Sequence, residues 1–171
     1  MSFEIERKFL LASDAWRALA TDRIPIRQAY LSGDGKASIR VRIKDKGGAT
    51  LTVKSRGAER RRLELEYPIP VLEAEAMIAL RRGSLIEKVR HAVPYGGCIW
   101  EVDVFEGENA GLVIAEVELL EEHQRIDVPA WVGPEVTGQP QYYNGALALR
   151  PFRTWPEVPS VAMGATPVSG Q

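Results

Sequence analysis

Residues 4–8 read EIERK and lie within Phe3–Leu11, where polar and apolar side chains alternate as in a β-strand. Successive side chains of a strand point to opposite faces, so Glu4, Glu6 and Lys8 share one face and apolar residues occupy the other. Taken alone, this is an ordinary strand with one solvated face. It decides the fold because six later strands also carry charge on one face and apolar residues on the other.

Seven further segments alternate between polar and apolar residues, six of them with charges on the polar face, and most of the short turns between them contain glycine. Strands joined by such turns favour antiparallel neighbours. The expected strands are Ile26–Ser32, Ala37–Lys44, Ala49–Ser55, Arg60–Pro68, Leu85–Pro94, Cys98–Phe105 and Leu112–Leu120.

Three helices are expected outside these strands, at Asp14–Thr21, Leu72–Arg82 and Gly145–Arg150. Asn144 is the expected N-terminal cap of the last helix. Before it, Asp127–Gly133 is expected to form a packed connection anchored by a tryptophan. We expect one domain over residues 1–154 and a flexible tail over residues 155–171, which are rich in Pro, Gly and Ser.

The charges on the polar faces are largely sorted by strand. Three strands carry bases there and the last two carry acids, while two others carry both signs. A face that only confers solubility usually mixes signs locally, although an open sheet with a solvated charged face is the alternative. We expect a mainly β (α+β) fold: an eight-stranded antiparallel closed barrel, or tunnel, with a charged lumen and a few helices packed outside. Closure is favoured because it removes unpaired strand edges.

The composition narrows the classes of function. The chain has 171 residues, of which 45% are hydrophobic, enough for a core at this size. Its formal net charge of −1 gives no sign of a basic surface for binding nucleic acid or a membrane. The single cysteine, Cys98, excludes an internal disulfide and fits a reducing compartment. We therefore expect a cytoplasmic protein without nucleic-acid or membrane partners.

A lumen lined with so many charges needs a compensating ligand, because buried charges are costly unless they are paired. Arginine can bind phosphate through two parallel hydrogen bonds, and lysine supplies a point charge. Carboxylates can take part only through a hard divalent cation that shares its oxygen ligands between protein and phosphate. The pattern therefore predicts a polyphosphate ligand with Mg²⁺ or Mn²⁺.

The motifs on these strands resemble a known family. EIERK is similar to the ExExK signature of the triphosphate tunnel metalloenzymes, or CYTH superfamily, and most like its small tripolyphosphatases. Gln139 departs from the pattern, because an acidic residue commonly follows the Thr-Gly pair there. The other matching motifs are Arg40-x-Arg42, Thr52-x-Lys54, Glu64-x-Glu66, Lys88-x-Arg90, Asp103 with Phe105, Glu116-x-Glu118, Val136-Thr137-Gly138 and Tyr143-Asn144.

The resemblance implies roles for individual residues. Seven basic residues would bind the phosphates of the substrate: Lys8, Arg40, Arg42, Lys54, Arg62, Lys88 and Arg90. Lys44 and Arg60 are further candidates for this role. The acidic residues would hold Mg²⁺ or Mn²⁺ and water. This set is Glu4, Glu6, Glu64, Glu66, Asp103, Glu116 and Glu118.

Lys8, Tyr30 and Glu6 are the candidate catalytic residues. We expect the neighbouring cations to lower the pKa of Lys8, and Tyr30 to hydrogen-bond it if the first two strands pair. The alternative is that Tyr30 only fills the lumen. Glu6 could hold the attacking water or its metal.

The expected function is metal-dependent hydrolysis of inorganic triphosphate to pyrophosphate and phosphate, with this small molecule as the partner. The alternatives are an adenylyl cyclase, a nucleoside or thiamine triphosphatase, or a non-catalytic polyphosphate-binding module. The sequence leaves the oligomeric state open, a homodimer included.

Overall fold

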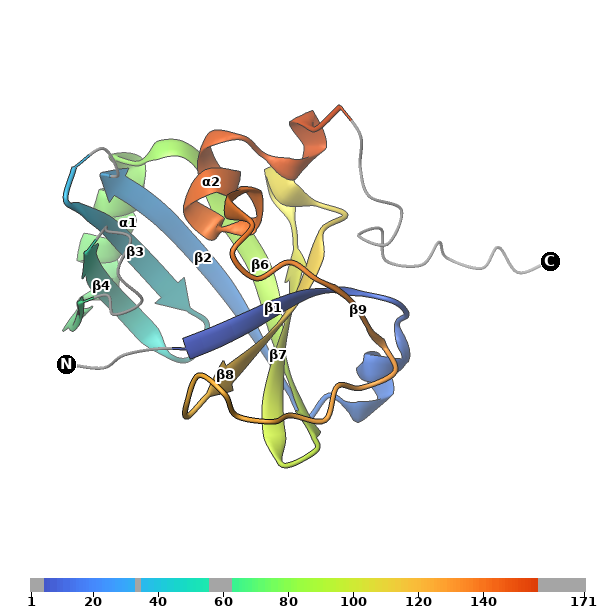
Figure 1. Cartoon of the computed structure of the whole chain (residues 1–171). Helices are drawn as coiled ribbons and strands as arrows, with labels where there is room; N and C mark the ends of the chain where they lie inside the picture. The colour runs from blue at the N-terminus through green and yellow to red at the C-terminus, as the bar shows by residue number, and fades with distance from the viewer. Residues whose placement is uncertain (1–4, 33–34, 56–62, 157–171) are drawn as a thin grey trace.

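A computed structural model describes residues 5–32, 35–55 and 63–156 of the chain. Its framework is one nine-stranded sheet with the order β5-β4-β3-β2-β6-β7-β8-β1-β9, and all its neighbours are antiparallel (Figure 1). The strands are β1 Ile5–Leu11, β2 Asp22–Ser32, β3 Ala37–Lys44, β4 Gly48–Ser55, β5 Glu64–Ile69, β6 Arg82–Tyr95, β7 Cys98–Phe105, β8 Val113–Leu119 and β9 Val132–Glu135.

The helical segments are short. The two α-helices are α1 Val71–Ala79 and α2 Asn144–Leu149. The 3₁₀ turns are η1 Ala15–Leu19, η2 Gly107–Asn109, η3 Pro140–Tyr142 and η4 Phe152–Thr154. The expected helix at Asp14–Thr21 is therefore only the five-residue turn η1, whose Trp16 is buried. The N-cap of α2 is Tyr143 and Asn144 is the first residue of the helix, so the expectation that Asn144 caps it was wrong by one position.

The mainly β, antiparallel fold is confirmed. Within the described residues, however, the sheet has nine strands and hydrogen bonds do not close it, since β5 and β9 lie at opposite ends of the strand order. The additional strand, β9, pairs with β1 and takes in the last two residues of the expected connection, Val132 and Gly133. Trp131 anchors that connection as predicted, with 4% of its surface exposed. Both edge strands contain a proline, Pro68 in β5 and Pro134 in β9, and proline has no N–H for a further strand.

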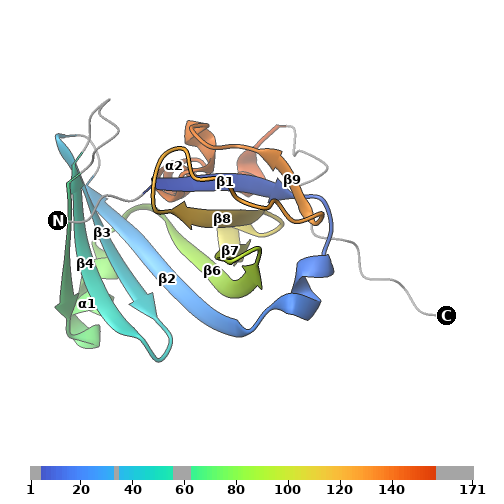
Figure 2. The same cartoon turned by 60° about the horizontal axis from the view of Figure 1, so that its bottom comes forward.

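The outer face of the curled sheet is covered by two apolar clusters. Helix α1 packs its buried Ala74 and Ile78 onto β2, β3 and β4, as Figure 2 shows for the layer formed by α1 and β4. The second cluster covers β1, β7 and β8 and is built around Trp16, Trp100 and Trp131. Burial of the outer apolar face leaves the charged face directed inward, as the alternation predicted.

The inner face changes from charged to apolar toward one end. On four strands the residue two positions from a charged one is apolar, and all four apolar residues share one core cluster. These pairs are Lys8 and Leu10, Lys88 and Ile86, Asp103 and Phe105, and Glu116 and Ile114. Leu147 and Ala148 of α2 belong to this cluster, so α2 packs against the inner face at that end instead of outside the sheet.

The segment after α2 remains attached to the same end. Asn109 Oδ1 accepts a hydrogen bond from the Phe152 backbone N–H at 2.8 Å. Trp155, assigned to the tail from sequence, packs its ring on Tyr142 and Phe152 at centroid distances of 5.4 and 5.1 Å. These contacts hold α2 in place from its C-terminal side.

Gly83 provides the first prediction, because it has a φ of +71° and an added Cβ would overlap the backbone carbonyl of Ala148. Gly48 has a similar φ of +74°, and apart from its two chain neighbours no described residue has an atom within 4 Å of the added Cβ. We expect Gly48→Ala to lower the free energy of unfolding by about 1–2 kcal/mol through backbone strain alone. Gly83→Ala should lower it by about 1–3 kcal/mol more, since α2 must also move. Urea unfolding of both variants measures the two free energies of unfolding. Equal decreases in the two variants would contradict the close contact between Gly83 and Ala148 of α2.

Candidate active site

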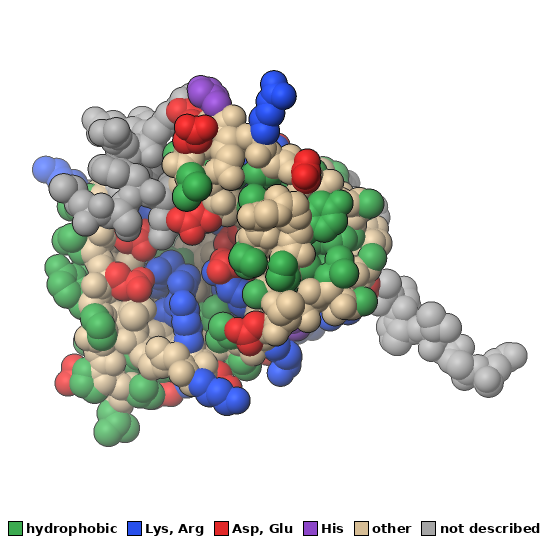
Figure 3. Space-filling view, turned by 90° about the horizontal axis from the view of Figure 1, so that it is seen from below, with side chains coloured by type: hydrophobic (Ala, Val, Ile, Leu, Met, Phe, Trp, Pro, Cys, Tyr) green, Lys and Arg blue, Asp and Glu red, His purple; other side chains and the backbone are tan. Residues whose placement is uncertain are grey.

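The curled sheet encloses a polar cavity of about 280 Å³. Figure 3 shows the hollow, in which basic and acidic side chains gather. Of the residues that the structure describes, thirteen line it: six are basic, six are acidic and one is an amide, and none is apolar. They are Lys8, Arg40, Arg42, Lys44, Lys54, Arg90, Glu6, Glu64, Glu66, Glu101, Glu116, Glu118 and Asn144.

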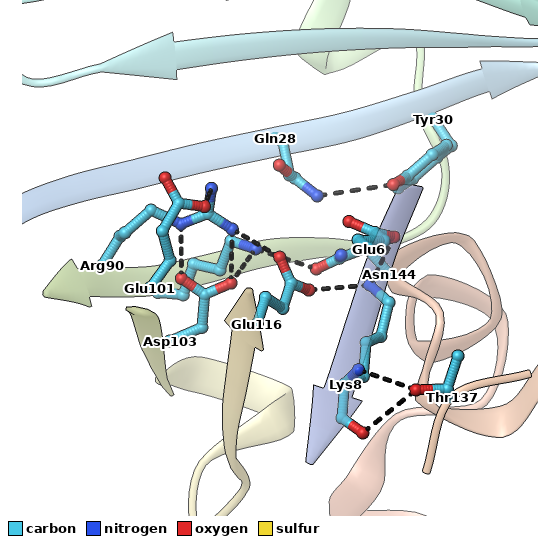
Figure 4. Close-up of polar contacts among 11 residues, drawn as sticks. Glu6, Lys8, Gln28, Tyr30, Arg90, Glu101, Asp103, Glu116, Thr137 and Asn144 are labelled. Atoms are coloured by element: carbon cyan, nitrogen blue, oxygen red, sulfur yellow. Dashed lines mark hydrogen bonds and ion pairs between the residues drawn. The ribbon is translucent and has the colours of Figure 1, made fainter. Parts of the chain in front are cut away.

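Arg90 on β6 is the most heavily paired cation of the site (Figure 4). Its Nε and Nη2 donate to Asp103 Oδ1 and Oδ2 at 2.7 and 2.8 Å. Nη2 also donates to Glu116 Oε2 at 3.0 Å, and Nη1 pairs with Glu101. Burial alone would lower the pKa of Arg90, but the three carboxylates outweigh it and raise the pKa. Arg90 therefore ties β6 to β7 and β8 with a permanent charge.

Lys8 continues this network onto β1. Its Nζ lies 2.7 Å from Glu116 Oε1 and 3.1 Å from Glu6 Oε1. Burial opposes the charge, yet Glu116 and Glu6 together raise the pKa of Lys8 above its ordinary value. The expected lowering of this pKa was wrong, because the cross-strand register places Glu116 directly opposite Lys8.

Tyr30 lies on β2, which is not a neighbour of β1 in the sheet, so the expected pairing of the first two strands was also wrong. The Tyr30 hydroxyl accepts a hydrogen bond from Gln28 Nε2 at 3.4 Å. Burial raises the pKa of Tyr30, although the charges of Arg40, Arg42 and Lys8 act in the opposite direction. The phenol therefore stays protonated at neutral pH and can donate a hydrogen bond or a proton.

Lys88 and Asp103 lie behind the wall of the cavity. Their side chains are 0% and 1% exposed, and Lys88 Nζ donates to Asp103 Oδ2 at 2.6 Å. Lys88 also donates to Asn144 Oδ1 at 3.2 Å, so the Asn144 side chain joins α2 to β6. Complete burial lowers the pKa of Lys88 to about 8 despite the charge of Asp103. Burial would raise the pKa of Asp103, but Lys88 and Arg90 hold it well below its usual value.

The β3 wall differs, because its charges are less compensated. Arg40 lies 3.7 Å from Glu66 and 4.0 Å from Glu64, and its buried Nε has no hydrogen-bond partner within the described structure. Arg42 forms no ion pair with any described residue, and its Nε donates to Gln28 Oε1 at 3.0 Å. Burial and the charges of Arg40 and Arg90 lower the pKa of Arg42. An anion in the cavity would relieve this repulsion.

The β4–β5 hairpin contributes a mixed wall beside β3. Lys54 Nζ pairs with Glu64 Oε2 at 2.9 Å. Thr52 links its two neighbours, accepting from Arg40 Nη2 at 3.1 Å and donating to Glu66 Oε2 at 3.1 Å.

The structure gathers ten of the predicted site residues around the cavity: Glu6, Lys8, Arg40, Arg42, Lys54, Glu64, Glu66, Arg90, Glu116 and Glu118. Lys88, Asp103 and Tyr30 are not among the lining residues. Glu4 and Arg62 lie outside the described residues.

The candidate lists from sequence omitted three contributors: Glu101, Gln28 and Asn144. Alternation already placed Glu101 and Gln28 on the inner face, so that signal could have included them. No local pattern could reveal that Asn144 reaches Lys88, because 56 residues separate them.

The contacts of the carboxylates show which of them have oxygens available for a metal ion. In the described part of the chain, no group of three or more His, Cys, Asp or Glu side chains is gathered to hold a metal ion. Asp103 and Glu116 use both carboxylate oxygens in ion pairs, whereas Glu118 is exposed and lies opposite Glu6 in the β1–β8 register. Carboxylate oxygens suit a hard divalent cation, so the donor chemistry of these residues fits such an ion.

None of the helices in the described residues is long and apolar enough to cross a membrane.

Comparison with known proteins agrees with this geometry. The CYTH domain model matches residues 2–146. An inorganic triphosphatase from Acetivibrio thermocellus is 45% identical over 159 residues, which cover 92% of this chain and 100% of the relative. An inorganic triphosphatase from Nitrosomonas europaea is 38% identical over 151 residues, which cover 85% of this chain and 97% of the relative. A crystal structure of the inorganic triphosphatase NE1496 superimposes with a TM-score of 0.64 and 35% identity, covering 87% of this chain and 96% of that one.

The pKa of Lys88 gives the second prediction. With a folded-state value of about 8 and an ordinary value of 10.5, the unfolded chain retains a proton between these pH values that the folded chain has lost. The cost of burying charged Lys88 is thus fully present below pH 8 and is relieved as the pH rises to 10.5. Relative to Lys88→Met, the wild-type free energy of unfolding should increase over this range. Urea titrations at several pH values measure the difference in the free energy of unfolding between wild type and Lys88→Met. A difference that stays constant or becomes smaller between pH 8 and pH 10.5 would contradict the lowered pKa of Lys88.

Proposed function

This chain belongs to the CYTH domain family, and from that premise we propose that it hydrolyses inorganic triphosphate to pyrophosphate and phosphate in the charged cavity. The relatives from A. thermocellus and N. europaea that bear the name inorganic triphosphatase align over nearly their whole length, which supports this choice.

The chemistry of the cavity lining carries the proposal. A nucleoside or thiamine group would need apolar or aromatic surface, and the described lining contains none. The volume of about 280 Å³ also falls just below the range of roughly 300–1,000 Å³ typical of pockets for drug-sized ligands. A compact anion that consists only of phosphate groups suits both properties. A cyclase, or a triphosphatase acting on nucleotides or thiamine triphosphate, is less favoured for the same reasons.

The charge balance of the lining supports a requirement for divalent cations. Six basic and six acidic side chains cancel formally, so the described lining does not neutralise a polyphosphate by itself. We propose that Glu6 and Glu118, assisted by Glu116, Glu64 and Glu66, would hold Mg²⁺ or Mn²⁺. When bound, such an ion supplies charge neutralisation and activates water. A module that only captured anions would not need these acids, which disfavours the non-catalytic alternative.

We propose that the β3 arginines and Lys54 hold the phosphate groups, because phosphoryl transfer depends chiefly on positioning and charge stabilisation. Lys8 and Arg90 remain charged and stabilise the negative charge that develops on the departing pyrophosphate. Tyr30 stays protonated and would donate a proton to that leaving group, and Glu6 would orient the attacking water. Lys88 and Asp103 act from behind the wall by positioning Arg90. Glu4 and Arg62 keep their proposed roles in metal and phosphate binding.

We further propose a cytoplasmic protein without a nucleic-acid partner, in keeping with the net charge of −1.

Phosphate release is the direct test of the proposed reaction. With Mg²⁺ or Mn²⁺, we expect the highest kcat/KM for tripolyphosphate, lower values for ATP and thiamine triphosphate, and little release from pyrophosphate. Chelation of the divalent cations should abolish release, and their return should restore it. Turnover that is unchanged by chelation, or that is highest with ATP, would contradict the proposal.

Tyr30→Phe separates the two roles considered for this residue. If the phenol donates a proton to the leaving group, kcat for tripolyphosphate should fall by about 10²-fold while KM changes little. The ring, which packs beside Gly145, is retained in this variant, so the fold should be preserved. An unchanged kcat would show that Tyr30 only fills space.

A further inference from the structure

Gln28 on β2 has no role in the proposed reaction so far, yet its side chain forms two hydrogen bonds beside the cavity. Its side chain is fully buried on the inner face of the sheet, opposite Arg42 of β3 in the register. Arg42 Nε donates to its Oε1 at 3.0 Å, and its Nε2 donates to the Tyr30 hydroxyl at 3.4 Å. A guanidinium has no acceptor, so the carbonyl oxygen of the amide must face Arg42.

Binding through Nε fixes the plane of the guanidinium. It leaves Nη1 and Nη2 of Arg42, which lines the cavity, for a ligand. These two nitrogens form the pair that binds a phosphate through parallel hydrogen bonds.

The neutral acceptor on Arg42 is unusual within this cavity. Of the six basic side chains in the described lining, Lys8, Arg40, Lys54 and Arg90 lie within ion-pair distance of carboxylates. Lys44 forms no ion pair with a described residue, but it is exposed, so Arg42 is the arginine of the described lining that is held by a neutral acceptor alone. A carboxylate at position 28 would also orient Arg42, but it would cancel the charge that a phosphate needs. The amide orients the side chain and leaves its charge available.

We infer that Gln28 is a positioning residue for substrate binding, which holds Arg42 with a neutral acceptor so that its guanidinium keeps both its orientation and its full charge for a phosphate group. The inference rests on the proposed triphosphatase function and adds to it a residue that affects phosphate binding through Arg42, with a longer second hydrogen bond to the Tyr30 hydroxyl. Loss of the amide should therefore weaken substrate binding more than it slows the chemical step.

Four variants test the inference: Gln28→Met, Gln28→Glu, Arg42→Met and the double variant Gln28→Met/Arg42→Met. Gln28→Met should raise KM for tripolyphosphate about tenfold, with a smaller change in kcat. This is the lower end of the loss found when a residue that orients a metal-binding side chain is removed. Gln28→Glu should raise KM at least as much, although it keeps an acceptor for Arg42. In the Arg42→Met background, Gln28→Met should change KM less than about twofold, because the two residues act as one unit.

Two controls separate positioning from a general loss of stability. Gln141→Met removes an exposed amide outside the cavity and should change neither Tm nor KM. Val41→Ala weakens the same strand as Arg42 from its outer, buried face, and should lower Tm with KM unchanged.

The outcomes distinguish this inference from the proposed reaction. A Gln28→Met protein with KM within twofold of wild type, or with the same increase in the Arg42→Met background, overturns the role of Gln28. If the wild type binds tripolyphosphate in calorimetry but releases no phosphate, the proposed hydrolysis is contradicted. The role of Gln28 is then decided by Kd: an increase of about tenfold in Gln28→Met supports it, and a Kd within twofold of wild type overturns it. A wild type that does not bind tripolyphosphate overturns both.

Discussion

The ion pairs that connect Lys88, Asp103, Arg90, Glu116 and Lys8 are the interaction on which the rest of the structure depends. They join β6, β7, β8 and β1 across the inner face, where water is largely excluded. Removal of one member of such a network leaves a buried charge without its partner, which is far more costly than the loss of a surface pair. This half of the sheet is therefore held in one arrangement before any ligand binds.

The opposite half of the cavity follows a different principle. On β3, the charges of Arg40 and Arg42 are only partly compensated, and Arg42 is held by an amide instead of an acid. Charges of equal sign at close range are unfavourable until an anion arrives, so this wall is prepared to bind phosphate. The site thus combines a rigid wall, whose charges are already paired, with a receptive wall that gains partners from its substrate.

The shape of the cavity depends on a simple change along the strands. Lys8, Lys88, Asp103 and Glu116 are each followed or preceded, two residues away, by an apolar residue on the same inner face. These apolar residues pack against α2, which occupies one end of the enclosed space. Asn144 begins α2 and lines the cavity, so one side chain connects the end of the cavity with the buried pair behind its wall.

The sequence by itself determined the antiparallel β architecture, the inward face of each strand and most of the side chains around the cavity. Alternation is a local property, and a strand keeps it wherever it packs. Only the tertiary structure decided which acids are used by which cations, why the pKa of Lys8 rises while that of Lys88 falls, and how α2 and Gln28 complete the site. Those outcomes depend on the register between strands that are distant in sequence, such as Lys8 opposite Glu116, and on burial, which no single segment specifies.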